Sequence, residues 1–128
     1  MLTAHDRALL KGTNLAHLTT LMPDGSPHAT PMWIDCDDEG YVLINTHPGR
    51  VKDLNVRRDA RVAVSVASSD DIYDWVAVRG RVAEFIEGDA AWEHINALSH
   101  RYNGTPYPVV HSRVIYRIAP EHVARSSD

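Results

Sequence analysis

The feature that most constrains the fold is a series of short extended segments separated by strong turn signals. Residues 15–22 favour a strand, and Pro23-Asp24-Gly25-Ser26 is a turn before a second extended run at residues 27–37. Asp37-Asp38-Glu39-Gly40 then turns the chain into a third apolar segment at residues 41–46. Because turn residues of these types join antiparallel neighbours, the sequence predicts a hairpin followed closely by a third antiparallel strand.

The helices predicted from the sequence are short. Thr3 resembles an N-cap, and the helix that it starts would end at Gly12. The apolar positions within residues 51–56 are spaced as in a helix rather than a strand. A third helix, capped by Asp89 and ended by the turn at residues 103–106, would present one apolar stripe made of Trp92, Ile95, Leu98 and Tyr102.

Three further strands are predicted in the rest of the chain. Residues 61–67 favour a buried strand, and a long strand runs from about residue 73 to residue 86, with Gly80 marking a bulge or a close backbone approach. A last strand at residues 114–118 would leave a loose tail at 124–128. Six strands with only short helices between them predict a mainly β protein built on an antiparallel barrel.

The length of the chain bears on its organisation. At 128 residues it can form one core, so we expect a single domain over residues 1–128. A chain of this size buries only about two-thirds of the surface that its unfolded form exposes. A site for a large cofactor therefore often borrows a second subunit, which favours a dimer.

Composition argues against several classes of function. The net charge of −4 argues against a general nucleic-acid-binding protein. No apolar run approaches the roughly 20 residues of a membrane span and no signal peptide is recognisable, so we expect a cytoplasmic protein. Cys36 is the sole cysteine, which excludes an internal disulfide. His94 and His100 lie six residues apart on a predicted helix and would face different sides, so we expect no metal site.

One basic segment contrasts with this acidic chain. Between Arg50 and Arg61, five basic residues stand against two acidic ones, a local charge of +3. Arg50 and Lys52 lie where a predicted strand gives way to a helix, so backbone N–H groups and two cationic side chains can converge on one anion. Taken alone, the pattern also fits the solvated face of a surface helix.

Several fragments, taken in order, resemble the pyridoxamine-phosphate-oxidase-like flavin and deazaflavin oxidoreductases. The resemblance covers residues 15–86 and is carried by Asp24-Gly25-Ser26-Pro27-His28-Ala29-Thr30-Pro31-Met32-Trp33, Asn45-Thr46, Gly49-Arg50-Val51-Lys52-Asp53-Leu54 and Arg57-Arg58-Asp59-Ala60-Arg61-Val62. It implies a split β-barrel homodimer, like the FMN-binding proteins, with the cofactor in a groove between the subunits. The Arg-Val-Lys-x-Leu form is similar to the branch that uses coenzyme F420, a deazaflavin. Asp53 and Ala60 depart from residues common in the family, which leaves FMN as the alternative cofactor.

The resemblance also implies a set of cofactor-contacting residues: Thr30, Pro31, Met32, Ile44, Asn45, Thr46, Gly49, Arg50, Val51, Lys52, and, from the partner subunit, Tyr73, Asp74 and Trp75. The side chains of Met32, Tyr73, Asp74 and Trp75 also fit a purely structural packing role. Tyr102 and Tyr107 flank a loop and are candidates for the substrate side of the pocket, although Tyr102 also completes the apolar stripe. No catalytic side chain is expected, because the cofactor carries the hydride.

The leading hypothesis is therefore an F420-dependent oxidoreductase that transfers a hydride between the cofactor and a small conjugated or heteroaromatic substrate. A first alternative keeps the fold but binds FMN or haem. A second is a carrier that binds a flavin, deazaflavin or haem without catalysis. Fold and cofactor do not fix the substrate.

Overall fold

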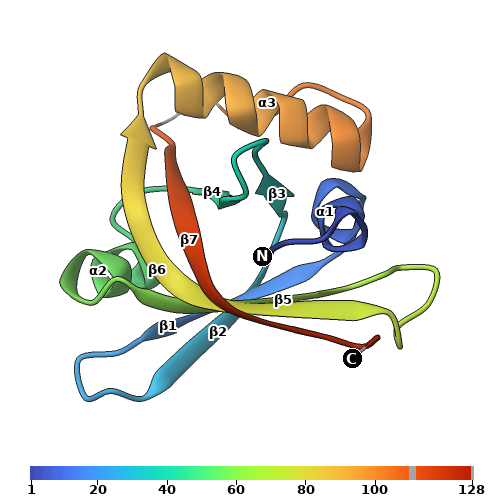
Figure 1. Cartoon of the computed structure of the whole chain (residues 1–128). Coiled ribbons are helices and arrows are strands. Elements are labelled where there is room, and N and C mark those ends of the chain that lie inside the picture. The colour runs from blue at the N-terminus through green and yellow to red at the C-terminus, as the bar shows by residue number, and fades with distance from the viewer. Residues whose placement is uncertain (110–111, 128) are drawn as a thin grey trace.

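One antiparallel sheet of seven strands organises the computed structural model, which describes residues 1–109 and 112–127 (Figure 1). The spatial order of the strands is β2-β1-β5-β6-β7-β4-β3. Their bounds are β1 Ala16–Leu21, β2 Pro27–Met32, β3 Asp35–Cys36, β4 Val42–Thr46, β5 Arg61–Ala67, β6 Trp75–Glu87 and β7 Val114–Arg125. The long strands β6 and β7 bend, and the curved sheet is a split β-barrel (Figure 1). This mainly β fold confirms the predicted class, with seven strands in place of six.

Alternation along the strands produces the core. In β5, Val62, Val64 and Val66 are buried, whereas the residues between them face outward. Residues that alternate in this way line one face of a sheet, because successive side chains point to opposite sides. Valines of β6, aliphatic residues of β4 and β7 and Leu9 and Leu10 complete the same cluster.

Three helices flank the sheet: α1 Ala4–Lys11, α2 Val51–Arg58 and α3 Asp89–Asn103. Thr3 and Asp6 form a reciprocal capping box at the start of α1, and Gly12 ends the helix, as predicted. Helix α3 lies across the end of the barrel, above β4 and β7 (Figure 1). None of the helices in the described part of the chain is both long and apolar enough to cross a membrane.

The start of α3 corrects one prediction. Gly88, not Asp89, is the N-cap residue, and no side chain bonds to the helix end there. Gly88 has φ 74° and ψ −149°, a conformation that is accessible essentially only to glycine. Asp89 therefore belongs to the first turn of α3, where its negative charge complements the helix dipole.

The extended run predicted at residues 27–37 is two strands rather than one. β2 ends at Met32 and pairs with β1, whereas β3 begins at Asp35 and pairs with β4. Between them, the N–H of Ile34 donates to the Tyr102 hydroxyl at 3.1 Å and its carbonyl accepts from Arg101 at 3.1 Å. These side chains of α3 replace strand partners, so the chain passes from one edge of the sheet to the other and β4 is not adjacent to β2.

The final strand is longer than predicted. β7 continues beyond residue 118 to Arg125, and Ala124 and Arg125 pair with Ala77 and Val76 of β6. The Arg125 guanidinium also binds the buried Asp6 carboxylate, with Nη2 and Oδ2 2.9 Å apart. Residues 124 and 125 are therefore tied to the sheet and are not part of a loose tail. Asp128 lies outside the described residues.

The bulge predicted at Gly80 is present. The register of β6 against β7 shifts between Arg79 and Gly80, and Gly80 faces Pro120. A Cβ atom on Gly80 would overlap the carbonyl oxygen of Ala119. Pro120 has no N–H to give to the ladder, which is tolerated at such an irregularity. Both readings of Gly80, a bulge and a close backbone approach, are confirmed.

We expect Gly80→Ala to lower the free energy of unfolding by about 1–3 kcal/mol, because the added methyl group forces β7 away from β6. Urea unfolding measures the loss. Ala83→Ser, an exposed change on the same strand, should stay within about 0.5 kcal/mol of the wild type. Equal stability of the two variants would contradict the close approach.

Candidate functional site

The junction between β4 and α2 carries the basic residues identified in the sequence. β4 ends at Thr46, and α2 begins at Val51 with Arg50 as its N-cap residue. Gly49 has φ 89°, so the turn requires a glycine at this position. Thr46 is buried, whereas Gly49, Arg50 and Val51 are exposed. The predicted change from strand to helix is confirmed, and it presents the start of α2 to the surface.

Asp53 holds this junction together. Its buried carboxylate accepts hydrogen bonds from the Gly49 N–H at 2.8 Å, from Arg57 Nε at 3.0 Å and from the Tyr116 hydroxyl at 2.6 Å. Burial alone would raise the pKa of Asp53, but hydrogen bonds from Tyr116, Gly49 and Arg57 outweigh it and keep the pKa below its ordinary value. The residue that departs from the family pattern is therefore the anchor of the turn.

Three cations gather beside the junction: Arg50, Lys52 and Arg113. Burial lowers the pKa of the Lys52 ammonium, and the nearby charges of Arg50 and Arg113 lower it further. Burial also lowers the pKa of Arg113. No acidic side chain that the structure describes lies within the 4.0 Å ion-pair distance of any of the three. Lys52 and Arg113 are half-buried, and cations in such positions normally have partners, so this arrangement is suited to an anionic ligand.

Arg113 is the member of this group that the sequence did not reveal. Its Nε donates to Asn45 Oδ1 at 2.9 Å, its Nη1 donates to the Tyr107 hydroxyl at 3.1 Å, and its guanidinium lies 5.0 Å from the centre of the Tyr107 ring. Arg113 directly precedes β7, and Val114 faces Thr46 of β4. The sequence shows only a basic residue before the last strand. Its place beside Asn45 follows from the pairing of β4 with β7, which the sequence does not reveal.

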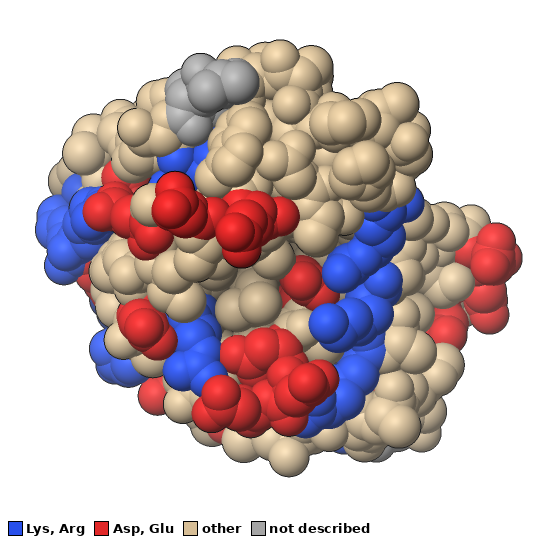
Figure 2. All heavy atoms as spheres, turned by 90° about the horizontal axis from the view of Figure 1, so that it is seen from above, with Lys and Arg blue, Asp and Glu red and all other residues tan. Residues whose placement is uncertain are grey.

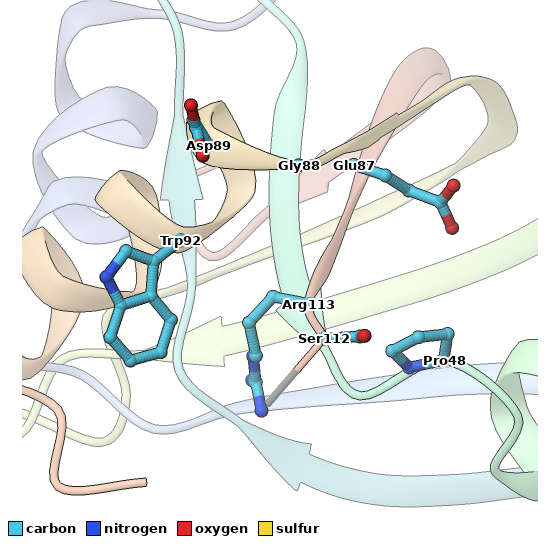
Figure 3. A pocket seen from close by; sticks show the side chains of 7 residues that line it. All are labelled: Pro48, Glu87, Gly88, Asp89, Trp92, Ser112 and Arg113. Atoms are coloured by element: carbon cyan, nitrogen blue, oxygen red, sulfur yellow. The ribbon is translucent and has the colours of Figure 1, made fainter. Parts of the chain in front are cut away.

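Two pockets meet at Arg113. One, of about 360 Å³, is lined by residues of β2, β4 and α3 and of the segments next to β1, β2, α3 and β7: Leu15, Pro31, Met32, Trp33, Asn45, Ile95, Tyr107 and Arg113. The other, of about 420 Å³, is lined by Pro48, Glu87, Gly88, Asp89, Trp92, Ser112 and Arg113 (Figure 3). Figure 3 shows the Arg113 guanidinium pointing away from the carboxylates of Glu87 and Asp89.

Aromatic side chains form one wall of the first pocket. Trp33 stacks on Tyr102, with ring centres 5.1 Å apart and planes 12° apart, and it meets the edge of Tyr107 at 6.4 Å. The Tyr102 hydroxyl donates to the Asn14 carbonyl at 2.7 Å. Of the two tyrosines predicted for the substrate side, Tyr107 lines the pocket, whereas Tyr102 supports Trp33 from behind.

The edge strand β2 contributes Pro31 and Met32 to the same pocket. Pro31 fits this position because an edge strand leaves one row of backbone groups without a partner strand. Two residues earlier than Met32, the buried Thr30 hydroxyl has no hydrogen-bond partner among the described residues. Buried polar atoms are normally satisfied, and the Thr30 hydroxyl, like His28 Nδ1 on the same strand, is left for a partner outside the described residues.

The other predicted cofactor residues are distributed differently. The side chain of Ile44 is buried in the core, so only its backbone is available to a ligand. Tyr73, Asp74 and Trp75 lie at the start of β6, whereas Glu87, at the opposite end of that strand, lines the second pocket. Tyr73 is 81% exposed, and Asp74 bonds to His5 at 2.8 Å. Within one copy of the chain these three residues do not reach either pocket, and their contribution from a partner remains a prediction.

A buried polar network supports Arg113 from behind. Asn45 Nδ2 donates to the Ala91 carbonyl at 2.8 Å and bonds to His94 Nδ1 at 3.1 Å. His94 Nε2 in turn bonds to Asp35 at 3.0 Å. Burial would raise the pKa of Asp35, but hydrogen bonds from His94 and Arg101 outweigh it and lower the pKa well below its ordinary value. Lys11 Nζ lies 3.4 Å from the same carboxylate.

This network also gives His94 a role that sequence reasoning missed. The sequence suggested only that His94 and His100 are no pair of metal ligands. In the described part of the chain, no cluster of three or more His, Cys, Asp or Glu side chains is arranged to hold a metal ion. Only the packing of α3 on β3 and β4 brings His94 between Asp35 and Asn45.

Comparison with known proteins shows the family to which the chain belongs. A model of the pyridoxamine 5'-phosphate oxidase family matches residues 2–126. The chain belongs to this family. It is 31% identical over 122 residues to the F420H(2)-dependent biliverdin reductase of Mycobacterium tuberculosis (strain CDC 1551 / Oshkosh), a match that covers 94% of this chain and 85% of the relative.

Solved structures of family members superimpose closely on the chain. An F420 reductase gives a TM-score of 0.83 at 28% identity, covering 96% of this chain and 98% of the other. A conserved hypothetical protein from Mycobacterium tuberculosis gives a TM-score of 0.79, also at 28% identity, covering 98% and 84%. The family fold is thus shared along almost the whole chain.

We expect Tyr116→Phe to lower the free energy of unfolding near neutral pH by about 1–3 kcal/mol, because it removes the donor from one buried oxygen of Asp53. The lowered pKa of Asp53 stabilises the fold above its ordinary value of 3.8, and this stabilisation is lost as the pH falls through the lower folded value. In the variant the folded pKa of Asp53 lies closer to 3.8, so the stabilisation that depends on pH should be smaller and its loss should be complete at a higher pH. Urea unfolding between pH 7 and pH 3 measures both effects.

Tyr41→Phe is the matched control, since the Tyr41 ring packs under Arg117, away from Asp53. It should follow the pH dependence of the wild type. The role of Asp53 would be refuted by a Tyr116→Phe protein whose stability matches that of this control over the whole pH range.

Proposed function

We propose that the chain is a homodimeric coenzyme F420-dependent oxidoreductase that acts on a small conjugated or heteroaromatic substrate. The observation that carries the proposal is the cluster of Arg50, Lys52 and Arg113, which have no carboxylate partner among the described residues and lie between the start of α2 and an aromatic pocket. The names of two relatives, an F420H(2)-dependent biliverdin reductase and an F420 reductase, support the choice of cofactor.

Arg50 and Lys52 would hold the anionic tail of the cofactor. Backbone N–H groups at the start of a helix and two cations suit a phosphate, and each charge-assisted hydrogen bond contributes on the order of 1.5–3 kcal/mol. The neighbouring backbone of Ile44, Thr46, Gly49 and Val51 belongs to the same binding segment. The edge strand from Thr30 to Met32 would meet the polar edge of the ring system.

When bound, coenzyme F420 supplies the hydride, and the protein supplies binding, orientation and exclusion of water. Trp33 and Tyr107 form an apolar wall on which a planar substrate can stack. Asn45 is buried, and its Oδ1 holds Arg113 at the edge of this pocket. No side chain is required as a nucleophile.

A second copy of the chain would complete the groove through Tyr73, Asp74 and Trp75. Ile72 and Tyr73 are among the most exposed large side chains, at 70% and 81%, and Trp75 lies next to them. Apolar side chains gathered in this way favour burial against another surface. Since these residues lie at the far end of β6 from the pockets of their own copy, they are suited to act in trans.

Titration of the purified protein with oxidised coenzyme F420 and with FMN tests the cofactor assignment. We expect tight binding of F420 that is weakened at least tenfold in Lys52→Ala, because about 1.4 kcal/mol lost at one charged contact is enough. Arg61→Ala is the control, since Arg61 is exposed and paired with Asp59 at 2.7 Å. Tight binding of FMN without affinity for F420 would refute the assignment, and unchanged affinity in Lys52→Ala would move the phosphate site elsewhere.

A steady-state assay tests whether the protein is an enzyme or a carrier. Reduced coenzyme F420 is supplied together with a panel of quinones and enones, and its oxidation is followed by absorbance. We expect turnover of at least one conjugated acceptor that depends on the protein. Tight F420 binding without turnover of any acceptor would favour the carrier.

A further inference from the structure

The pocket of about 360 Å³ combines an aromatic wall with one charged group. Trp33 and Tyr107 provide aromatic surface and Arg113 provides the positive charge, whereas Pro31 and Met32 line the side of the pocket where β2 would meet the ring system of the cofactor. The volume lies within the range of small-molecule sites, which are mostly apolar with a few polar groups that fix orientation. The shape and lining therefore suit a planar molecule with an anionic group at one end.

The Arg113 guanidinium has hydrogen-bonding capacity to spare. Of its five N–H groups, Nε–H is used by Asn45 Oδ1, one on Nη1 by the Tyr107 hydroxyl and one on Nη2 by the Asn45 carbonyl at 3.4 Å. One N–H on each terminal nitrogen has no partner among the described residues. No carboxylate of the described residues neutralises the charge, and burial disfavours it, so an incoming carboxylate would gain a strong partner.

We infer that Arg113 is the anion contact for the substrate, and that this pocket selects planar conjugated molecules that carry a carboxylate. The inference rests on the proposed function and names the class of its substrate. Arg113 lies near Arg50 and Lys52, but these two residues at the start of α2 already supply the charge needed for the tail of the cofactor. Arg113 instead bonds to Asn45 and Tyr107, both of which line the aromatic pocket.

His94 is a positioning residue for this contact. Arg113 can only donate, so Asn45 must present Oδ1 to it and direct Nδ2 towards Ala91 and His94. His94 Nδ1 therefore accepts, and its Nε2–H donates to Asp35. The Asp35 carboxylate is fixed in turn by Arg101 and lies within 3.4 Å of Lys11. The network thus sets the orientation of the Asn45 amide, which sets that of Arg113.

Calorimetric titration with 2-naphthoate and 2-naphthamide tests the inference, because the two molecules share a planar ring system and differ in charge. The wild type, saturated with oxidised coenzyme F420, should bind the acid at least tenfold more tightly than the amide, a difference of about 1.4 kcal/mol. Arg113→Gln should abolish the preference, whereas Arg113→Lys should keep part of it. Arg81→Gln is the control, since Arg81 is exposed and pairs with Glu121.

Equal binding of acid and amide by the wild type overturns the inference, and so does a full preference retained in Arg113→Gln. The titration is repeated without cofactor. If coenzyme F420 displaces 2-naphthoate, Arg113 belongs to the anionic tail of the cofactor, and the inference fails while the proposed function stands. If coenzyme F420 does not bind at all, the proposed function fails, and the titration without cofactor still decides the role of Arg113.

Two variants of His94 test the positioning role. Gln can accept from Asn45 and donate to Asp35, so His94→Gln should keep the acid preference within about threefold, whereas His94→Phe should lose most of it. Thermal unfolding of both variants shows whether they are folded. A His94→Phe protein that is folded and keeps the full preference overturns the positioning role.

Discussion

The buried carboxylate of Asp53 is the interaction on which the arrangement of the site depends. One side chain ties the Gly49 turn, the body of α2 through Arg57 and the strand β7 through Tyr116. Because β7 pairs with both β4 and β6, this contact fixes the start of α2 relative to the centre of the barrel. A carboxylate buried with three donors is well compensated, whereas the same group without them would be costly. The basic junction is therefore presented on a rigid support.

A second carboxylate, Asp35, plays the corresponding role on the other side of the pocket. Its carboxylate contacts His94 and Arg101 of α3 and lies close to Lys11 of α1. Through His94 and Asn45 it is connected to Arg113. Figure 2, which views the molecule from above, on the side where α3 lies, shows basic and acidic side chains lying next to one another. Arg7, Arg58 and Arg79 also have no ion pair among the described residues, so the site is marked by the clustering of Arg50, Lys52 and Arg113 rather than by a lack of partners alone.

The sequence predicted most elements and misplaced several connections. The turn residues, the N-cap at Thr3 and the strand at residues 61–67 are local signals, and the structure confirms each of them. Residues 27–37 were wrongly predicted as one strand, because the break between β2 and β3 depends on α3 side chains that bind the Ile34 backbone. The tail was misjudged for a similar reason, since Arg125 is held by Asp6, more than a hundred residues away in the chain. Local patterns carry no information about such partners.

The same distinction between local patterns and contacts of distant residues applies to the candidate site. The sequence by itself determined that a basic strand-to-helix junction, with Arg50 and Lys52 next to a glycine turn, exists in an acidic, mainly β chain, because adjacent residues form it. Only the tertiary structure decided what faces this junction. The pairing of β4 with β7 brings Arg113 to Asn45, and the packing of α3 brings His94 to Asp35. These residues are far apart in the chain, and their contacts arise from burial of a shared core, which no local pattern of residues specifies.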